Sequence, residues 1–274
     1  MAPDRLTVLV TGSNSGIGLA TVLEAARGGL RAVGTVRSEA KAEVVQAAAR
    51  EAGVEVETAL VDVTDADACV EVVDRYRPDA LVNNAGFSVT GAVEDVSDDE
   101  ARRALETMVL APARLARLAI PHMRERGRGR VVNVSSIFGR ATAPLNGWYQ
   151  ASKHALEALS DALRAEVARD GIAVVLVEPG GFRTGIWDEV EGDVEELAGS
   201  RYEAAYRRTL GLSRLSEPVM GDPSRVAKVI MRAVTARRPR ARYLVGVDAR
   251  AFALAEGLTP TAVTDRVKRF TLGL

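Results

Sequence analysis

The sequence predicts an α/β fold built as one doubly wound parallel sheet with helices on both of its faces. Short runs rich in β-branched residues alternate with amphipathic helical stretches along most of the 274 residues. This order is typical of strand–helix–strand units joined by right-handed crossovers. Several of the runs, such as residues 173–177, are continuously apolar. Strands of that kind are covered on both faces, as they are in a parallel sheet.

The expected elements follow this alternation. Strands are predicted at residues 6–11, 32–36, 55–61, 80–82, 130–134, 173–177 and 243–247, with helices starting near residues 16, 40, 65, 98, 149 and 223. Two of these starts have specific signals, since Ser97 with Glu100 forms a capping box and Asp222 precedes Pro223 as an N-cap residue. The chain contains no fixed-period repeat and no linker rich in Pro, Gly and Ser. We therefore expect a single domain spanning residues 1–274.

Two regions depart from the alternation. Residues 185–217 hold an acidic stretch followed by a segment rich in Tyr and Arg, with no strand signal. We interpret this region as a lid or insertion. The segment after residue 247 is predicted to form one or two short helices.

Composition excludes several classes of protein. The 36 Lys and Arg residues nearly balance the 37 Asp and Glu residues, so the chain has no overall basic field for nucleic acid. A single Cys69 cannot form an internal disulfide, and two His residues are too few for the usual zinc ligand set. Because no apolar stretch approaches a membrane span and no signal peptide is evident, we expect a cytoplasmic protein without membrane contact that binds a small molecule and no metal.

A glycine-rich turn follows the first predicted strand. It reads Thr-Gly-Ser-Asn-Ser-Gly-Ile-Gly over residues 11–18 and leads into a helix. Glycines allow a sharp turn and a close backbone approach, and the helix N-terminus offers free N–H groups to a pyrophosphate. The turn therefore predicts a dinucleotide site, although a tight turn without a ligand is an alternative.

The end of the second strand indicates which dinucleotide is bound. Many such sites have an acidic residue there that holds the ribose 2′-hydroxyl, whereas this chain has Arg37. A guanidinium at that point would pair with a 2′-phosphate, so NADP(H) is favoured over NAD(H). A solvated arginine at the start of a loop is the alternative.

Further polar residues follow the later strands. Asp62 and Val63 come after the third strand, and residues 83–86 read Asn-Asn-Ala-Gly after the fourth. Ligands of open α/β sheets bind at these carboxyl ends. Ser136 follows the fifth strand, and Tyr149 and Lys153 are four residues apart at the start of the next helix. They share one helical face, so the ammonium group can lower the pKa of the phenol.

Together these motifs resemble the short-chain dehydrogenase/reductase family. The resemblance includes the glycine turn, Asn-Asn-Ala-Gly, a Ser thirteen residues before the Tyr, the Tyr-x-x-x-Lys pair, and Pro179-Gly180 followed by Thr184. It covers about residues 5–185. It implies a Rossmann-type domain with a cofactor-binding part at about 5–135. The catalytic and substrate-binding part would be about 136–274, including the lid at 185–217.

The resemblance also implies roles for individual residues. Tyr149 would be the general acid/base, Lys153 would lower its pKa and bind the nicotinamide ribose, and Ser136 would hold the substrate oxygen. The implied cofactor-binding residues are Gly12, Ser13, Ser15, Gly16, Ile17, Gly18, Arg37, Asp62, Val63, Asn84, Ala85, Gly86, Tyr149, Lys153, Pro179, Gly180, Phe182 and Thr184. The expected activity interconverts a secondary alcohol and a ketone or aldehyde of medium size and apolar character, such as a steroid, polyketide or fatty-acyl compound. Family members commonly assemble as homodimers or homotetramers.

One position departs from the family pattern. Members usually carry an Asn thirteen residues ahead of the Pro of Pro121-His122-Met123, where this chain has Met108. In the family that Asn helps to hold a water linking the Lys to solvent, and a thioether is a weak acceptor. We expect a weakened proton relay unless Thr107 or the carbonyl of residue 108 compensates. The alternatives to an oxidoreductase are therefore an NADP-binding sensor or scaffold with lost catalysis, or an epimerase or dehydratase of the same family.

Overall fold

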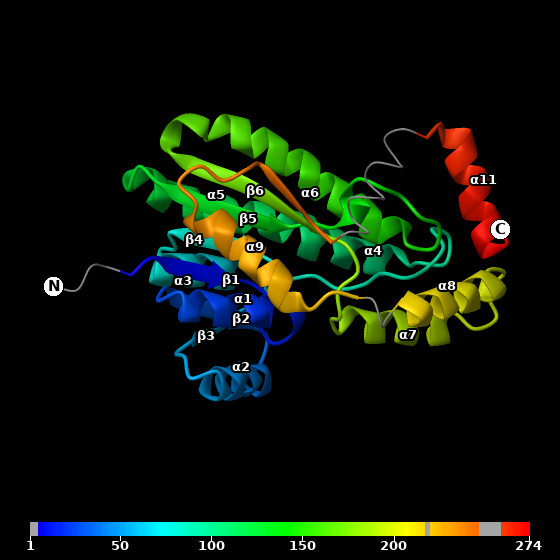
Figure 1. Cartoon of the computed structure of the whole chain (residues 1–274), viewed down its shortest axis with the longest axis horizontal. Coiled ribbons are helices and arrows are strands. Elements are labelled where there is room, and N and C mark those ends of the chain that lie inside the picture. The colour runs from blue at the N-terminus through cyan, green and yellow to red at the C-terminus, as the bar shows by residue number, and fades with distance from the viewer. Residues whose placement is uncertain (1–4, 217–219, 247–258) are drawn as a thin grey trace.

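The computed structural model describes residues 5–216, 220–246 and 259–274. Its centre is a parallel sheet of seven strands in the order β3-β2-β1-β4-β5-β6-β7 (Figure 1). The strands are β1 (Thr7–Val10), β2 (Arg31–Val36), β3 (Glu57–Leu60), β4 (Ala80–Asn83), β5 (Gly129–Val134), β6 (Ile172–Pro179) and β7 (Arg242–Val245). The chain winds outward from β1 to β3 and then returns to add β4 on the other side of β1. A crevice at such a reversal is where open α/β sheets bind ligands.

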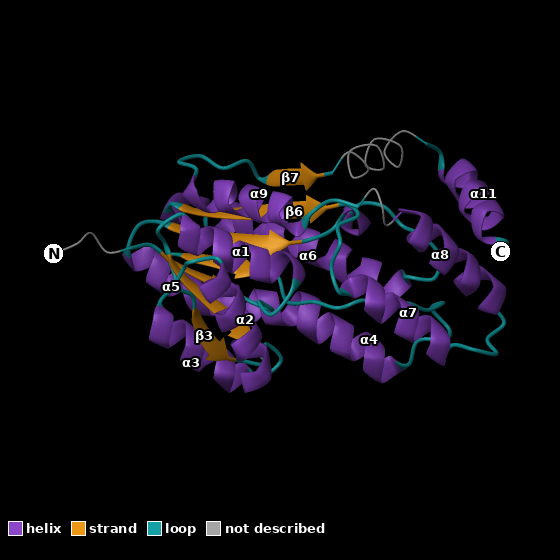
Figure 2. Cartoon of the chain, turned by 60° about the horizontal axis from the view of Figure 1, so that its bottom comes forward, coloured by secondary structure: helices purple, strands orange, loops and turns teal. Residues whose placement is uncertain are grey.

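Helices cover both faces of the sheet. Those of the sheet layers are α1 (Gly16–Arg27), α2 (Glu39–Glu51), α3 (Ala66–Tyr76), α4 (Asp98–Leu105), α5 (Ala111–Glu125), α6 (Gly147–Glu166) and α9 (Pro223–Thr235). Short segments add a π-helical turn η1 (Glu106–Leu110) and the 3-10 turns η2 (Ile137–Gly139) and η3 (Ala168–Asp170). Beyond the sheet lie α7 (Ile186–Glu196), α8 (Glu203–Ser216) and α11 (Thr261–Leu272) (Figure 2).

Apolar strand residues explain why both faces are covered. Val8 and Val10 of β1 lie in one core with α1, α2 and α9. Leu9, between them, lies in a second core with α3 and α5. Successive side chains of a strand point to opposite faces, so a continuously apolar strand requires helices on both sides.

The structure confirms the predicted fold class and the seven strands. Oγ of Ser97 accepts from the N–H of Glu100 at 3.2 Å, and Oδ1 of Asp222 accepts from the N–H of Ser224 at 2.8 Å. Helix α6 begins at Gly147, two residues earlier than expected from Tyr149. The predicted end of the last strand at Val247 lies outside the described residues.

The region interpreted as a lid or insertion contains two helices, α7 and α8. Helices α7 and α8 share a small apolar core with α11, in which Val194, Tyr206 and Leu272 are buried. They lie together beyond the carboxyl ends of the strands (Figures 1 and 2). Helix α11 agrees with the predicted C-terminal helix, whereas residues 247–258 lie outside the description. In the described ranges, no helix combines the length and apolar character needed to cross a membrane.

Candidate active site

The glycine turn is clamped to the end of β4. Oγ1 of Thr11 accepts from the N–H groups of Asn84 and Ala85, both at 3.0 Å. The Asn84 amide in turn donates to the carbonyl of Thr11 at 2.9 Å and to that of Gly12 at 3.0 Å. Ser13 donates to the carbonyl of Val10. The side chains of Ser13 and Asn84 therefore hold the turn in shape, which leaves their backbone to border a ligand.

Two glycines of the turn have no room for a side chain. A Cβ on Gly12, whose φ is +68°, would lie 2.9 Å from Cα of Ala85. A Cβ on Gly18 would lie 2.1 Å from the carbonyl oxygen of Gly12. Ser15 then begins α1 as an N-cap residue without a side-chain capping bond. The first N–H groups of α1, those of Gly16 and Ile17 included, are left for an anion at the crevice.

Arg37 and Asp62 lie at the neighbouring ends of β2 and β3. Arg37 is exposed, and Val63 is buried beneath the same edge of the sheet. Burial alone would raise the pKa of Asp62, but hydrogen bonds from the N–H and hydroxyl of Thr64, with help from the Arg37 charge, hold it below its ordinary value. Asp62 is therefore ionised at neutral pH, and Arg37 remains accessible to an anionic group.

Ser136, Tyr149 and Lys153 come together where β5 ends and α6 begins. Oγ of Ser136 accepts from the N–H of Phe138 at 3.1 Å and is hydrogen bonded with Tyr149. Lys153, one turn after Tyr149 on α6, is 5% exposed and donates from Nζ to the carbonyl of Val134 at 3.0 Å. Its Nζ lies 5.6 Å from the centre of the Tyr149 ring. The phenol is thus held between a hydroxyl and an ammonium group.

Burial dominates the ionisation of this pair. It lowers the pKa of Lys153 to about 8, against the charge of Glu157, which raises it. Burial raises the pKa of Tyr149, and the hydrogen bond with Ser136 opposes that shift. At neutral pH the phenol carries its proton and the lysine carries its charge. The arrangement can therefore give a proton to a carbonyl oxygen or take one from an alcohol.

Met108 lies in the π-helical turn η1, where the N–H of Ala111 reaches the carbonyl of Glu106. Its side chain is 1% exposed and lies against Gly86, whose Cβ would be 3.4 Å from the sulfur. It packs in a small apolar cluster bordered by Phe87, Trp148 and Tyr149. Interruptions of this kind are frequent at functional sites because they free backbone groups from the regular ladder.

The loop after β6 lies over the start of α1. Thr184 is so close that a Cβ on Gly16 would be 3.1 Å from its methyl group. Phe182 is buried in the core and packs against Gly221. Pro179 is buried at the end of β6, and Gly180 donates its N–H to the carbonyl of Val245 at 2.9 Å. The aromatic residues Phe87 and Trp148 border the cluster beside Tyr149, whereas Phe182 is part of the core.

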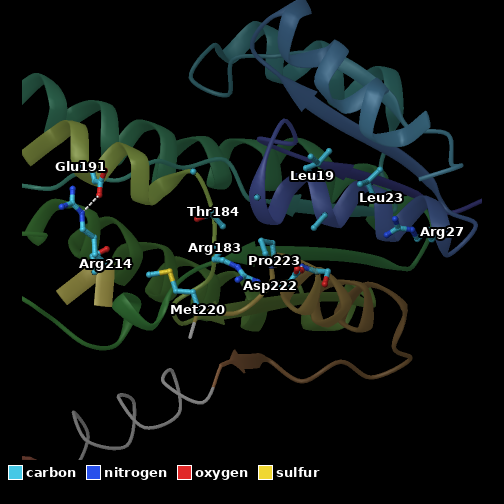
Figure 3. A pocket seen from close by; sticks show the side chains of 15 residues that line it. Leu19, Leu23, Arg27, Arg183, Thr184, Glu191, Arg214, Met220, Asp222 and Pro223 are labelled. Carbon is cyan, nitrogen blue, oxygen red and sulfur yellow. Dashed lines mark hydrogen bonds and ion pairs between the residues drawn. The ribbon is translucent and has the colours of Figure 1, made fainter. Parts of the chain in front are cut away.

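A pocket of 710 Å³ opens beside this loop. Figure 3 shows Leu19 and Leu23 of α1 on one side and Thr184, Arg183 and Met220 on the other. At the lid end Nε of Arg214 donates to Glu191 of α7 at 3.0 Å. The pocket thus joins the N-terminus of α1 to the lid helices.

Sequence reasoning missed a group of buried charges behind the catalytic pair. It contains Glu157, Glu178, Arg140 and Arg242, with Glu178 wholly buried. The sequence could have predicted one member of this group, because Glu157 follows Lys153 by four residues and so shares its helical face. The other members are far apart in sequence. The described part of the chain holds no cluster of His, Cys, Asp and Glu suited to a metal ion.

Comparison with known proteins agrees with this geometry. Residues 6–195 match the family model described as short chain dehydrogenase. The chain belongs to the short-chain dehydrogenase family. This short-chain dehydrogenase is 32% identical to the uncharacterized oxidoreductase YusZ of Bacillus subtilis, with 96% of this chain and 97% of the relative covered. It is 31% identical to mouse retinol dehydrogenase 16, with 96% of this chain and 88% of the relative covered.

A solved structure shows the same fold. A variant of the actinorhodin polyketide ketoreductase, crystallised with NADPH, superposes with a TM-score of 0.77 at 31% identity, covering 93% of this chain and 98% of that one. This short-chain dehydrogenase is thus an oxidoreductase by family.

Proposed function

We propose that the protein is an NADP(H)-dependent oxidoreductase that interconverts a secondary alcohol and a ketone or aldehyde. The observation that carries the proposal is the convergence of Ser136, Tyr149 and Lys153 at one end of the sheet. The uncapped N-terminus of α1 belongs to the same edge. An acid/base group therefore lies beside a turn that suits a dinucleotide.

The residues present fit a nicotinamide dinucleotide. The turn has no space for side chains at Gly12 and Gly18, and the N–H groups of Gly16 and Ile17 suit a pyrophosphate. The edges formed by Asp62 with Val63 and by residues 84–86 would border the adenosine, and residues 179–184 would border the nicotinamide. When bound, the cofactor supplies or accepts a hydride.

The chain's own residues transfer the proton to or from the substrate oxygen. In reduction the Tyr149 hydroxyl donates its proton to the substrate oxygen, which Ser136 holds by a hydrogen bond. The Lys153 ammonium stabilises the phenolate left behind, since opposite charges at short range favour the charged form. In oxidation the same phenolate accepts the proton of the alcohol.

Arg37 supports NADP(H) as the cofactor. An exposed guanidinium at the end of β2 suits a 2′-phosphate, and the Asp62 carboxylate nearby is engaged with Thr64. The polyketide ketoreductase with a similar fold was crystallised with NADPH, which agrees with this choice.

The expected substrate is apolar and of medium size. Phe87, Trp148 and Met108 form an apolar border at Tyr149. The curated relatives include retinol dehydrogenases and a 3-ketodihydrosphingosine reductase of Bacteroides thetaiotaomicron, whose named substrates are largely apolar. We further propose that the protein works in the cytoplasm as a homodimer or homotetramer.

The test is NADPH consumption by the purified protein across a panel of apolar ketones and aldehydes, with NADH measured in parallel. We expect turnover that prefers NADPH and that Tyr149→Phe abolishes while Tyr202→Phe, on the exposed rim of the lid, retains it. Tight NADPH binding without turnover of any carbonyl would contradict the oxidoreductase proposal. That result would favour a sensor or scaffold in which Met108 has cost the protein its relay.

A further inference from the structure

A buried network of charges lies behind the catalytic pair. Glu178 of β6 is 0% exposed and contacts Nε of Arg140 at 2.7 Å and Nε of Arg242 at 3.2 Å. Arg140 follows η2, four residues after Ser136, and Arg242 is the first residue of β7. The network therefore connects the segments that follow Ser136 and precede Pro179.

Helix α6 contributes two more carboxylates to the network. Oε2 of Glu157, a residue 7% exposed, accepts from Nε of Arg242 at 3.1 Å. Both carboxylate oxygens of Asp161 accept from the same guanidinium at 2.7 Å. Arg242 thus anchors three carboxylates, and Asp161 is also paired with Arg164. Burial and the nearby Glu157 raise the pKa of Glu178, against the two guanidinium groups.

The free oxygen of Glu157 points toward the end of β5. Among the described residues, its Oε1 is buried without a hydrogen-bond partner, and so is Oγ of Ser135. Both lie beside Gly139, where an added Cβ would be 3.3 Å from Oε1 and 2.7 Å from Oγ. The carboxylate therefore reaches from Arg242 to the strand end that carries Ser136.

Glu157 is also the carboxylate closest along α6 to Lys153. The two residues are one helical turn apart, both are buried, and the Glu157 charge acts on the Lys153 ammonium. Asp161 is a further turn away and partly exposed, and Glu178 faces two guanidinium groups. An ammonium group loses its hydration on burial and then needs a compensating charge. For Lys153, Glu157 is the group that supplies it.

We propose that Glu157 is a positioning residue of the active site, whose carboxylate, anchored by Arg242, keeps the buried Lys153 ammonium charged beside Tyr149. This inference rests on the proposed function, because it assigns Lys153 an effect on the Tyr149 proton. It concerns ionisation of the free protein as well as turnover, so the two claims can fail separately.

The first experiment needs no substrate or cofactor. Titration of Lys153 is followed by NMR of protein that carries 13C-labelled lysine, with Lys153→Met identifying its signal. In Glu157→Gln, which keeps the side-chain size and removes the charge, Lys153 loses its proton more readily and its midpoint moves to lower pH by about one unit. Asp161→Asn is the matched control, since it shares α6 and Arg242 but lies one turn farther from Lys153, and it leaves the midpoint in place.

The second experiment measures alcohol oxidation against pH with NADP⁺. The acid limb of kcat/KM moves to higher pH in Glu157→Gln, which gives roughly tenfold slower oxidation at pH 7 for a shift of about one unit. Glu157→Asp, which restores the charge, returns the limb toward the wild-type position. A purely structural role would lower stability and rate without moving either midpoint.

Three results separate the claims. An unchanged Lys153 midpoint in Glu157→Gln overturns the inference, whatever happens to the rate. If the Lys153 midpoint is displaced but the wild-type protein turns over no alcohol or carbonyl, the inference stands and the proposed function is contradicted. If the Gln variant does not fold, Glu157→Leu provides the charge-free side chain, and it must show the same displacement.

Discussion

The expected preference for NADPH over NADH depends on one exposed side chain, that of Arg37. It stands at the end of β2 without a carboxylate in the position that would hold a ribose 2′-hydroxyl. Arg37→Ala is expected to raise KM for NADPH about tenfold or more, because a charge-assisted bond contributes about 1.5–3 kcal/mol. KM for NADH is expected to stay unchanged. Arg31→Ala, at the other end of β2 and paired with Glu57, is the control. Equal effects on both cofactors would contradict the assignment.

Met108 allows a second prediction at this scale. Met108→Asn is expected to raise kcat by restoring an amide to the relay, and to lower the free energy of unfolding because the amide enters an apolar, buried cluster. Met108→Leu, similar in size and shape, is expected to change neither by much. Steady-state rates and urea unfolding of the three proteins measure both effects. If kcat does not rise in Met108→Asn, then Met108 does not limit the relay.

Lys153 gives a pH dependence whose sign follows from its burial. Its pKa is about 8 in the folded protein and ordinary in the unfolded chain, so between about pH 8 and 10.5 the unfolded chain binds more protons. The contribution of Lys153 to stability therefore rises with pH across this window. Lys153→Met is expected to gain stability over the wild type near pH 7, and that gain shrinks as the pH rises toward 10. Urea unfolding at several pH values measures it, and a gap that widens with pH would contradict the buried, charged lysine.

The candidate site was predicted from sequence to the extent that its residues follow strands directly. The glycine turn, Arg37, Asp62 and Ser136 each come just after a strand, so a parallel sheet brings them to one edge. Glu178, Arg140 and Arg242 escaped prediction because each reads as an ordinary polar residue. Only the pairing of β6 with β7 brings Arg242 to Glu178. Phe182 shows the same limit, since the sequence was compatible with both the crevice and the core, and only the structure shows its packing on Gly221.

At the scale of elements, α9 depends on the cap at its start. Asp222 accepts from the N–H of Ser224, and Pro223 occupies the first helical position. Asp222→Ala is expected to cost about 1 kcal/mol of unfolding free energy, as is usual for loss of an N-cap. Arg225→Ala, an exposed change in the same turn, is expected to be close to neutral. Equal losses in the two variants would show that the cap is not the cause.

The lid is fastened to the loop before α4 by Tyr206. Its buried hydroxyl accepts from the N–H of Ala92 at 2.7 Å and donates to Asp95 at 2.6 Å. Burial, with the nearby Asp95 carboxylate, raises the pKa of Tyr206 to about 12, so this contact does not titrate in the working range of pH. Helices α7 and α8 were not predicted as helices because the acidic run in α7 obscures its apolar pattern. Val194 of α7 lies in a small core with residues of α8, α11 and neighbouring loops.

Tyr206→Phe tests the fastening of the lid. The N–H of Ala92 would lose its partner in a buried position, at a cost of about 1–3 kcal/mol. We expect faster proteolysis within residues 196–203 and a higher KM for the carbonyl substrate. Tyr202→Phe removes a hydroxyl that bonds Glu94 at the exposed rim, and it is expected to have little effect on either. Equal protease sensitivity in the two variants would contradict a fastening role for Tyr206.

At the scale of the whole molecule, the proposed cofactor-binding and catalytic roles are distributed along the sheet. The segments that follow β1 to β4 carry most of the residues proposed to bind the dinucleotide, the loop after β6 is proposed to border the nicotinamide, and the segment after β5 carries the acid/base group together with α6. The alternation of strands and helices was enough to predict the parallel sheet, whereas the distribution of roles along it came from the resemblance to the family. No sequence pattern predicts the quaternary structure in the way that the alternation of strands and helices predicts the sheet.

Helices α5 and α6 border a groove of 460 Å³ on the outside of the sheet, lined by small and apolar residues, by exposed Leu159, and by the charged residues Arg117, Arg124 and Glu166. We expect this face to be covered by a second copy. Leu159→Glu is then expected to shift the protein toward the monomer in light scattering, whereas Leu215→Glu, on exposed α8, is not. A wild-type protein that is monomeric at micromolar concentration would contradict this assembly.

The π-helical turn η1 also indicates how the length of this segment could change in the family. A π-turn holds one more residue than an α-helical turn, so removing a single residue from 106–110 would leave α4 and α5 as one uninterrupted helix. Because both kinds of turn complete one rotation, α4 would keep its orientation, and Ala101 and Ala104 would stay in their buried positions. The deletion would remove the backbone groups that the wider turn frees beside Met108. An alignment of relatives should thus show a difference in length of one residue in this segment, with the flanking helices unchanged.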